Sequence, residues 1–182
     1  MTEWAHGTAA KRSSTTVIKM LDRLLTSGFD KDTSIGLINS AINLNSRQET
    51  YATIDISVID LITGNIEFVK NGACPTFIKS KNKVEVIKAV SLPVGMLDKI
   101  DLAIYDKDLS GGEIIVMCTD GVLESNTEYS NKEVWVKNLL ENIETEDVQK
   151  IAELLVNESV DNDFGLAKDD MTVVVAKVMK NA

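Results

Sequence analysis

The sequence predicts an α+β domain in which antiparallel strands and helices occupy separate stretches of the chain. Apolar residues near the N-terminus recur at helical spacing, the next stretch alternates apolar and polar residues between turns, and helical spacing returns before a final β-rich segment. Single strands and helices do not alternate regularly, as they would in a doubly wound sheet. With 182 residues, 44% of them hydrophobic, we expect one domain, residues 1–182.

The first stretch predicts a helical hairpin. A serine pair at 13–14 would cap the first helix, which stops at 27–28. A second helix would open at Asp30 or Asp32 and end near the polar residues 43–46. The apolar stripes of the two helices consist of Val17, Ile18, Leu21, Leu24 and Leu25, and of Ile35, Ile38, Ala41 and Ile42.

From Thr50 the period changes to two, which predicts consecutive antiparallel strands. Ala52, Ile54, Ile56 and Val58 mark the buried face of the first strand. The later expected elements are a turn at 63–65, strands at 66–68, 76–79 and 84–87, a loop at 91–95, a strand at 101–105, a turn at 111–112, a strand at 114–118, helices at 134–140 and 148–155, and a strand within 171–178. The run 114–118 is so apolar that we expect burial on both faces.

Composition argues against several classes of function. A formal net charge of −9 would repel nucleic acid, so we expect no nucleic-acid partner. No stretch approaches the roughly 18 to 20 apolar residues of a membrane span, so we expect no membrane segment in this chain. Cys74 and Cys118 are far apart in apolar surroundings, which favours two buried, reduced thiols over a disulfide.

The motif Thr119-Asp120-Gly121 directly follows the most apolar predicted strand. A carboxylate at that place is costly unless it is paired or coordinates a metal, and the glycine lets backbone come close. Asp120 is therefore either a metal ligand or a residue that caps its own turn, which Asp-Gly pairs often do.

A second acidic motif, Asp169-Asp170-Met171-Thr172, opens the last apolar strand. Adjacent carboxylates repel each other, and a hard cation such as Mg²⁺ or Mn²⁺ prefers oxygen ligands. Taken alone, the motif is equally compatible with a solvated acidic loop.

Together the two motifs resemble the metal-dependent protein phosphatases of the PPM (protein phosphatase 2C) superfamily, in which an Asp-Gly follows a buried strand and Asp-(Asp/Asn)-x-Thr lies near the C-terminus. The resemblance is closer to the stage II sporulation protein E type and runs in order from about Gly7 to Lys177. It is carried by the stretches 13–16, 24–25, 28–31, 38–40, 52–55, 58–61, 72–79 and 91–95.

This resemblance implies a PPM-type phosphatase fold, an antiparallel β-sandwich flanked by helices, with a two-metal site that activates water. It implies that Asp120 and Asp169 are catalytic metal ligands for Mn²⁺ or Mg²⁺, that Gly121 gives clearance, and that Asp170 and Thr172 support the ligands. It also implies a phosphorylated anti-anti-sigma (STAS-type) protein as substrate and a cytoplasmic domain of membrane-anchored proteins. Residues 14–45 match helices that act as a switch in the family, and the alternative is that these helices only cover a sheet.

The N-terminus departs from the family pattern. The family's first motif, Asp-Gly-Met-Gly-x-Gly, aligns with residues 2–7, where the bridging carboxylate is missing. We therefore expect an N-terminally incomplete domain that lacks the first strands; a truncation, a mis-started frame and a degenerate copy all remain open. Neither His6 nor Glu3 is a good substitute, because imidazole suits Mg²⁺ poorly and Glu3 is displaced by one position, and Trp4 is expected to be an apolar contact.

Two hypotheses from different classes follow. The first is a protein serine/threonine phosphatase whose activity as an isolated chain is reduced by the missing carboxylate. The second is a pseudo-phosphatase or docking module that binds the phosphorylated partner without efficient hydrolysis. A plain interaction domain with two capping aspartates would make both motifs and the extended resemblance coincidental. The loop at 91–95 is either a substrate contact or an ordinary connection.

Overall fold

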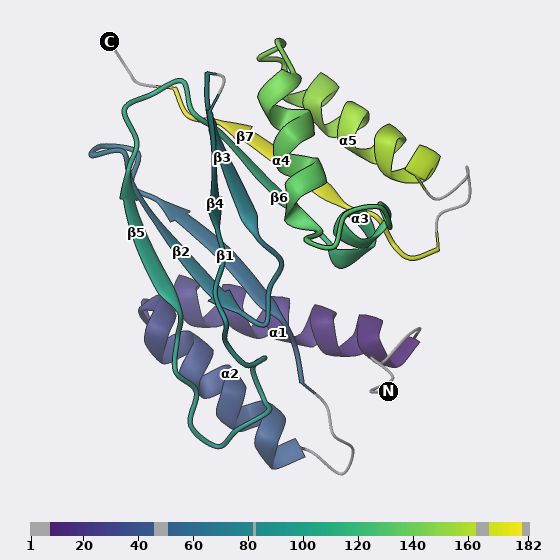
Figure 1. Ribbon diagram of the computed structural model, residues 1–182. Helices are drawn as coiled ribbons and strands as arrows, with labels where there is room; N and C mark the ends of the chain where they lie inside the picture. The colour runs from purple at the N-terminus through teal and green to yellow at the C-terminus, as the bar shows by residue number, and fades with distance from the viewer. Residues whose placement is uncertain (1–7, 46–50, 82, 163–167, 180–182) are drawn as a thin grey trace. The chain divides into compact units, whose positions relative to one another are not determined.

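The computed structural model describes residues 8–45, 51–81, 83–162 and 168–179 (Figure 1). The chain divides into two compact units, each with its own core. Unit 1 contains residues 1–56, 69–73 and 89–104, and unit 2 contains residues 57–68, 74–88 and 105–182.

The N-terminal residues of unit 1 form the predicted helical hairpin, α1 (Thr8–Thr26) and α2 (Lys31–Asn45). Helix α1 begins before the serine pair that was predicted to cap it, because the preceding Ala-Ala-Lys-Arg run consists of strong helix formers and contains no breaker. It ends where predicted. Gly28 has a φ of +89°, and the Phe29 amide donates to the Leu24 carbonyl at 3.1 Å, as in a glycine-terminated helix end.

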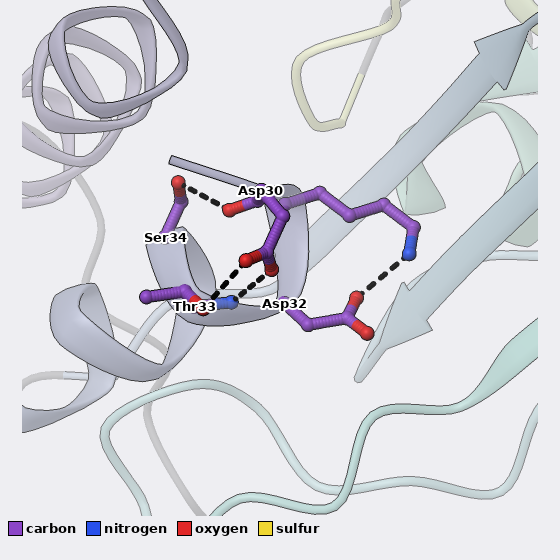
Figure 2. Close-up of polar contacts among 5 residues, drawn as sticks. Asp30, Asp32, Thr33 and Ser34 are labelled. Carbon is purple, nitrogen blue, oxygen red and sulfur yellow. Dashed lines mark hydrogen bonds and ion pairs between the residues drawn. The ribbon is translucent and has the colours of Figure 1, made fainter. Parts of the chain in front are cut away.

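Helix α2 begins directly after Asp30, one of the two aspartates that the sequence offers as its start. Figure 2 shows the Asp30 carboxylate accepting two hydrogen bonds from Thr33, one from the backbone N–H and one from the hydroxyl, both at 2.8 Å. These bonds, the backbone one first, lower the pKa of Asp30. The Ser34 hydroxyl donates to the Asp30 carbonyl at 2.7 Å. Asp30 is therefore the N-cap, while Asp32 forms a 2.7 Å ion pair with Lys31.

The core of unit 1 lies between this hairpin and strands β1 (Ile54–Ile59) and β2 (Asn65–Asn71). Its buried members come from both helices, both strands and the loop after residue 90: Val17, Ile35, Ile38, Ile54, Val69 and Val94. The apolar stripes of the helices thus cover one face of the strands, as their spacing predicts. Val58 was expected on the buried face of β1 but is 45% exposed. It is the next-to-last residue of β1, which lies at the edge of its sheet among the described strands.

The described strands form two sheets. One has the order β1-β2-β5 and the other the antiparallel order β4-β3-β6-β7. The remaining strands are β3 (Thr76–Ser80), β4 (Lys83–Ile87), β5 (Ile104–Asp108), β6 (Ile114–Cys118) and β7 (Val173–Lys177). Strand β5 begins later than the predicted 101–105, and the carbonyl of Asp101 accepts a hydrogen bond from the Asn71 side chain instead of from the backbone of a neighbouring strand.

Unit 2 packs both faces of the four-stranded sheet. On one face, Ile114 and Val116 join a cluster with helices α3 (Asp120–Glu124), α4 (Glu133–Asn142) and α5 (Val148–Asn162), which Figure 1 shows beside these strands. On the other face, Ile115 packs with Ile66 and Phe68 of β2. The predicted burial of the run 114–118 on both faces therefore holds for its first three residues. Its last two are only half-buried, because the strand there approaches the end of the sheet.

Two expectations from composition can be compared with the structure. Cys74 and Cys118 are free thiols, as predicted, but both are half-buried at the margin of the α3–α5 cluster instead of fully buried. No helix in the described ranges combines the length and the apolar character needed to cross a bilayer. The two sheets with flanking helices confirm the predicted α+β class.

Candidate metal site

Sheet topology brings the two acidic motifs together. Strand β6 ends at Cys118 and β7 begins at Val173, and these two residues are directly paired in the antiparallel register. The residues that follow β6 and those that precede β7 must therefore lie at the same end of the sheet. Both motifs belong to unit 2, so their proximity is a property of one compact unit.

Thr119 connects the motifs by hydrogen bonds. Its amide donates to the Thr172 carbonyl at 3.1 Å, and its hydroxyl donates to the Asp170 carbonyl at 3.0 Å. The same hydroxyl accepts from the Thr172 amide at 3.0 Å. The acidic turn at 169–172 is thus held directly beside the residue that precedes Asp120.

Gly121 allows the backbone of the acidic turn to approach closely on the other side of Asp120. A Cβ at this position would lie 2.5 Å from the Asp170 carbonyl oxygen and 3.3 Å from the Asp169 Cβ. The predicted role of Gly121, clearance for neighbouring backbone, agrees with this packing. Helix α3 starts at the same point and is anchored by buried Val122 and Leu123.

The carboxylates of Asp120, Asp169 and Asp170 are exposed. One oxygen of Asp120 accepts the Gly121 amide at 3.0 Å, and one oxygen of Asp169 accepts the Asp170 amide at 2.8 Å. Asp120 therefore does bond to its own turn, as one reading of the sequence predicts. A carboxylate has several acceptor positions, so this bond is compatible with metal coordination as well.

The donor set at this end of the sheet suits a hard divalent cation, because it offers carboxylate and carbonyl oxygens. Within the residues that the structure describes, no group of three or more His, Cys, Asp or Glu side chains is placed to hold a metal. The assignment of Asp120 and Asp169 as metal ligands stays a prediction. The predictions for Glu3, Trp4 and His6 concern residues 1–7, which lie outside the described residues.

The loop that follows Val90 is held in place by hydrogen bonds within unit 1. The Ser91 hydroxyl donates to the Lys70 carbonyl at 2.6 Å, and the Asn71 side chain donates to the carbonyls of Leu92 and Asp101. Val94 exchanges two 2.8 Å backbone hydrogen bonds with Ala52. These contacts agree with an ordinary connection between strands, and a substrate contact there stays a prediction.

Sequence reasoning did not identify two sets of side chains that organise these regions. One is the Thr119 hydroxyl, whose signal in the sequence is a hydroxyl residue between a buried strand and Asp-Gly. The other is the pair Asn39 and Asn43 of α2, whose side chains donate to the Leu97 carbonyl. Asparagines in an amphipathic helix carry no sequence signal that distinguishes them from solvent-facing residues.

Comparisons with known proteins give the family. Residues 5–179 match the family model described as stage II sporulation protein E (SpoIIE). Stage II sporulation protein E of Bacillus subtilis (strain 168) is 35% identical over 176 residues, which are 97% of this chain and 21% of that protein. The chain therefore spans about a fifth of the length of that curated relative.

Solved structures agree with the sequence match. The PP2C phosphatase domain of B. subtilis SpoIIE, solved with a fragment of its regulatory domain, has a TM-score of 0.89 at 35% identity over 98% of this chain and 52% of that one. The manganese-presoaked SpoIIE phosphatase domain has a TM-score of 0.70 at 31% identity over 100% of this chain and 78% of that one. These matches confirm the predicted resemblance, and this chain belongs to the stage II sporulation protein E family, with PP2C-type phosphatase domains as its structural relatives.

Proposed function

We propose that this chain is a metal-dependent protein serine/threonine phosphatase domain that acts on phosphoserine of a small anti-anti-sigma (STAS-type) protein in the cytoplasm. One observation carries the proposal: the Asp120-Gly121 and Asp169–Thr172 motifs meet at one end of β6 and β7 in a fold shared with the SpoIIE phosphatase domain. The STAS-type substrate and the cytoplasmic location rest on family resemblance.

Asp120 and Asp169 would hold the cation, Mn²⁺ or Mg²⁺, and the SpoIIE phosphatase domain soaked with manganese supports this choice of ion. A bound divalent ion lowers the pKa of water and offsets the negative charge of phosphoryl oxygens. Asp170 and Thr172 position the Asp169 side of the site through their backbone contacts with Thr119. Gly121 keeps the two sides close by leaving space for the Asp170 carbonyl.

The charge of the chain supports a requirement for metal. The three exposed carboxylates of the site belong to a chain with a formal net charge of −9, so the protein alone would repel a phosphoester. Hydrolysis of a phosphoprotein at this place therefore needs a compensating cation. Chelation of divalent ions should abolish activity, and added Mn²⁺ should restore it.

The test is a phosphoserine assay in excess Mn²⁺, with a phosphorylated STAS-type protein and a phosphoserine peptide as substrates. We expect slow turnover that Asp120→Ala and Asp169→Ala abolish while the variants remain folded. Asp106→Ala is a matched control, because Asp106 is an exposed aspartate of β5, which belongs to the sheet that does not contain β6 and β7. Turnover that survives both site substitutions would refute the assignment of the site.

A second function, a docking module, is favoured by the sequence of residues 2–7, which has no bridging carboxylate where the family's first motif aligns. It predicts binding of the phosphorylated partner without hydrolysis. The same assay distinguishes the two, because retained binding with no turnover supports the module, and turnover that depends on Asp120 supports the phosphatase. A chain that neither binds the phosphorylated partner nor hydrolyses it would contradict both functions.

A further inference from the structure

Thr119 lies where strand β6 ends and helix α3 begins, and the helix uses its backbone carbonyl. That carbonyl accepts the Val122 amide at 3.1 Å and the Leu123 amide at 3.4 Å. Thr119 is the N-cap residue of α3, but its side chain makes no capping hydrogen bond to the helix. The hydroxyl is thus directed to another part of the site.

The sheet register shows what the hydroxyl replaces. Cys118 pairs with Val173, so Thr119 and Thr172 are the next pair along the β6–β7 ladder. A hydrogen-bonded antiparallel pair exchanges two backbone bonds. Only one is present, from the Thr119 amide to the Thr172 carbonyl, because the Thr119 carbonyl is engaged by α3. The Thr172 amide donates to the Thr119 hydroxyl instead, at 3.0 Å.

The hydroxyl also extends the contact into the acidic turn. It donates its own proton to the Asp170 carbonyl at 3.0 Å. A threonine hydroxyl has one proton to donate and can accept in return, and both capacities are used here. Without the hydroxyl, the described contacts would leave a single backbone hydrogen bond from Thr119 to the turn that carries Asp169.

We propose that Thr119 is a positioning residue of the phosphatase site, whose hydroxyl holds the Asp169–Thr172 turn at the distance from Asp120 that binding of a divalent cation requires. This inference rests on the proposed function, since it assigns the cation to these carboxylates. Thr119 itself does not touch the cation. Direct hydrogen-bond partners of metal ligands typically contribute about 10- to 100-fold in metal affinity, and Thr119 acts one contact further away, through the backbone of the turn.

The test compares Thr119→Val with Thr119→Ser in the full chain. Valine has the shape of threonine but cannot form either hydroxyl hydrogen bond, whereas serine keeps both. Thr26→Val is the matched control, because the Thr26 hydroxyl donates to the Asp22 carbonyl at 2.7 Å within α1 and belongs to unit 1. Circular dichroism and thermal unfolding establish that each variant is folded.

The first readout is hydrogen exchange of the Thr172 amide without metal. We expect Thr119→Val to lose the protection that the wild type and Thr119→Ser show. The second readout is binding of Mn²⁺ alone, titrated by electron paramagnetic resonance. We expect Thr119→Val to weaken Mn²⁺ binding by up to about tenfold, the lower end of the range for direct partners of metal ligands, with Thr119→Ser and Thr26→Val close to the wild type.

The outcomes separate this inference from the proposed function. Wild-type protein that binds Mn²⁺ with an affinity unchanged in Thr119→Val contradicts the positioning role, even if the phosphatase activity is present. Unchanged protection of the Thr172 amide in Thr119→Val contradicts it as well. Wild-type protein that binds Mn²⁺ in a Thr119-dependent way but hydrolyses no phosphoserine contradicts the proposed function and leaves the positioning role supported. Wild-type protein that binds no Mn²⁺ overturns both.

Discussion

Replacing Gly121 with alanine is the sharpest perturbation of the site that the structure offers. The added Cβ would lie 2.5 Å from the Asp170 carbonyl oxygen and 3.1 Å from its carbonyl carbon, whereas real Cβ atoms essentially never approach another heavy atom within 3.0 Å. The difference between 3.0 and 2.5 Å means a displacement of at least 0.5 Å. The obstacle is backbone, so no side chain can rotate away.

Either the acidic turn or helix α3 has to move. The turn is held by Thr119, and α3 is anchored by buried Val122 and Leu123, so both responses cost free energy. Overpacking of this kind costs about 1–3 kcal/mol of unfolding free energy. Misplacement of a catalytic group by about 1 Å can cost about a hundredfold in rate, so a shift of half that size suggests a loss on the order of tenfold.

Urea denaturation, Mn²⁺ titration and the phosphoserine assay measure these losses separately. Gly36→Ala is the matched control, because Gly36 sits inside α2 and an added Cβ there would meet no described atom within 4 Å. At that position the same substitution should stabilise the protein by about 0.5–1 kcal/mol, since alanine is the better helix former. If Gly121→Ala matched the wild type in Mn²⁺ affinity and stability, the claim that a Cβ at residue 121 displaces the acidic turn or helix α3 would be refuted.

Three further substitutions test the fold. Asp30→Ala should lower stability at neutral pH by removing the N-cap of α2. Hydrogen bonds hold the pKa of Asp30 below 3.8 in the folded state, so its contribution to stability is present above 3.8 and is lost as the pH falls through the folded pKa. The urea midpoints of variant and wild type should therefore converge in acid. Lys79→Ala should cost about 1–3 kcal/mol in urea denaturation, because the buried Lys79 ammonium donates to the Leu140 carbonyl at 2.6 Å. Gly72→Ala should cost about 1–3 kcal/mol or more in thermal unfolding, because φ is +64° and Pro93 Cγ lies 2.7 Å from the new Cβ.

Each of these substitutions has a counterpart in the chain. Asp30→Asn keeps an oxygen that can accept the Thr33 amide, so it should lose less stability at neutral pH than Asp30→Ala, and equal losses would contradict the capping role of Asp30. Lys83→Ala, at an exposed position of β4, should change stability by less than about 0.5 kcal/mol. Gly28→Ala carries the strain of a positive φ with open space around it, so it should cost less than Gly72→Ala. The opposite order would show that Pro93 does not limit Gly72.

Local sequence signals were sufficient where local physics decides the structure. The Asp30 cap, the stop at Gly28 and the β3–β4 hairpin each depend on residues within a few positions, and each lies where the sequence predicts. The start of α1 and the position of β5 were misplaced for different reasons. A good cap signal at 13–14 was outweighed by helix formers before it, and β5 starts only after Asp101, whose carbonyl accepts from the side chain of Asn71, a residue distant in sequence.

The same contrast between local and distant determinants applies to the candidate metal site. The acidic motifs are readable because a carboxylate beside a run of buried apolar residues needs an explanation, whereas the role of the Thr119 hydroxyl depends on a residue 53 positions away. No periodicity reports that Thr119 and Thr172 are neighbours. The pairing follows only from the adjacency of β6 and β7, which the sequence does not specify.

That adjacency also determines how firmly each half of the site is held. Strand β6 lies between β3 and β7, so Asp120 follows a strand supported on both sides and a helix with buried residues. In the described part of the chain, β7 pairs with β6 alone, and its residue Val174 is 56% exposed. The Asp169 half therefore depends more on its few contacts with Thr119 and Gly121 than the Asp120 half depends on any single contact. Substitutions that loosen β7 should thus weaken metal binding before they unfold the protein, because the less firmly held carboxylate of the pair is the one attached to the edge strand.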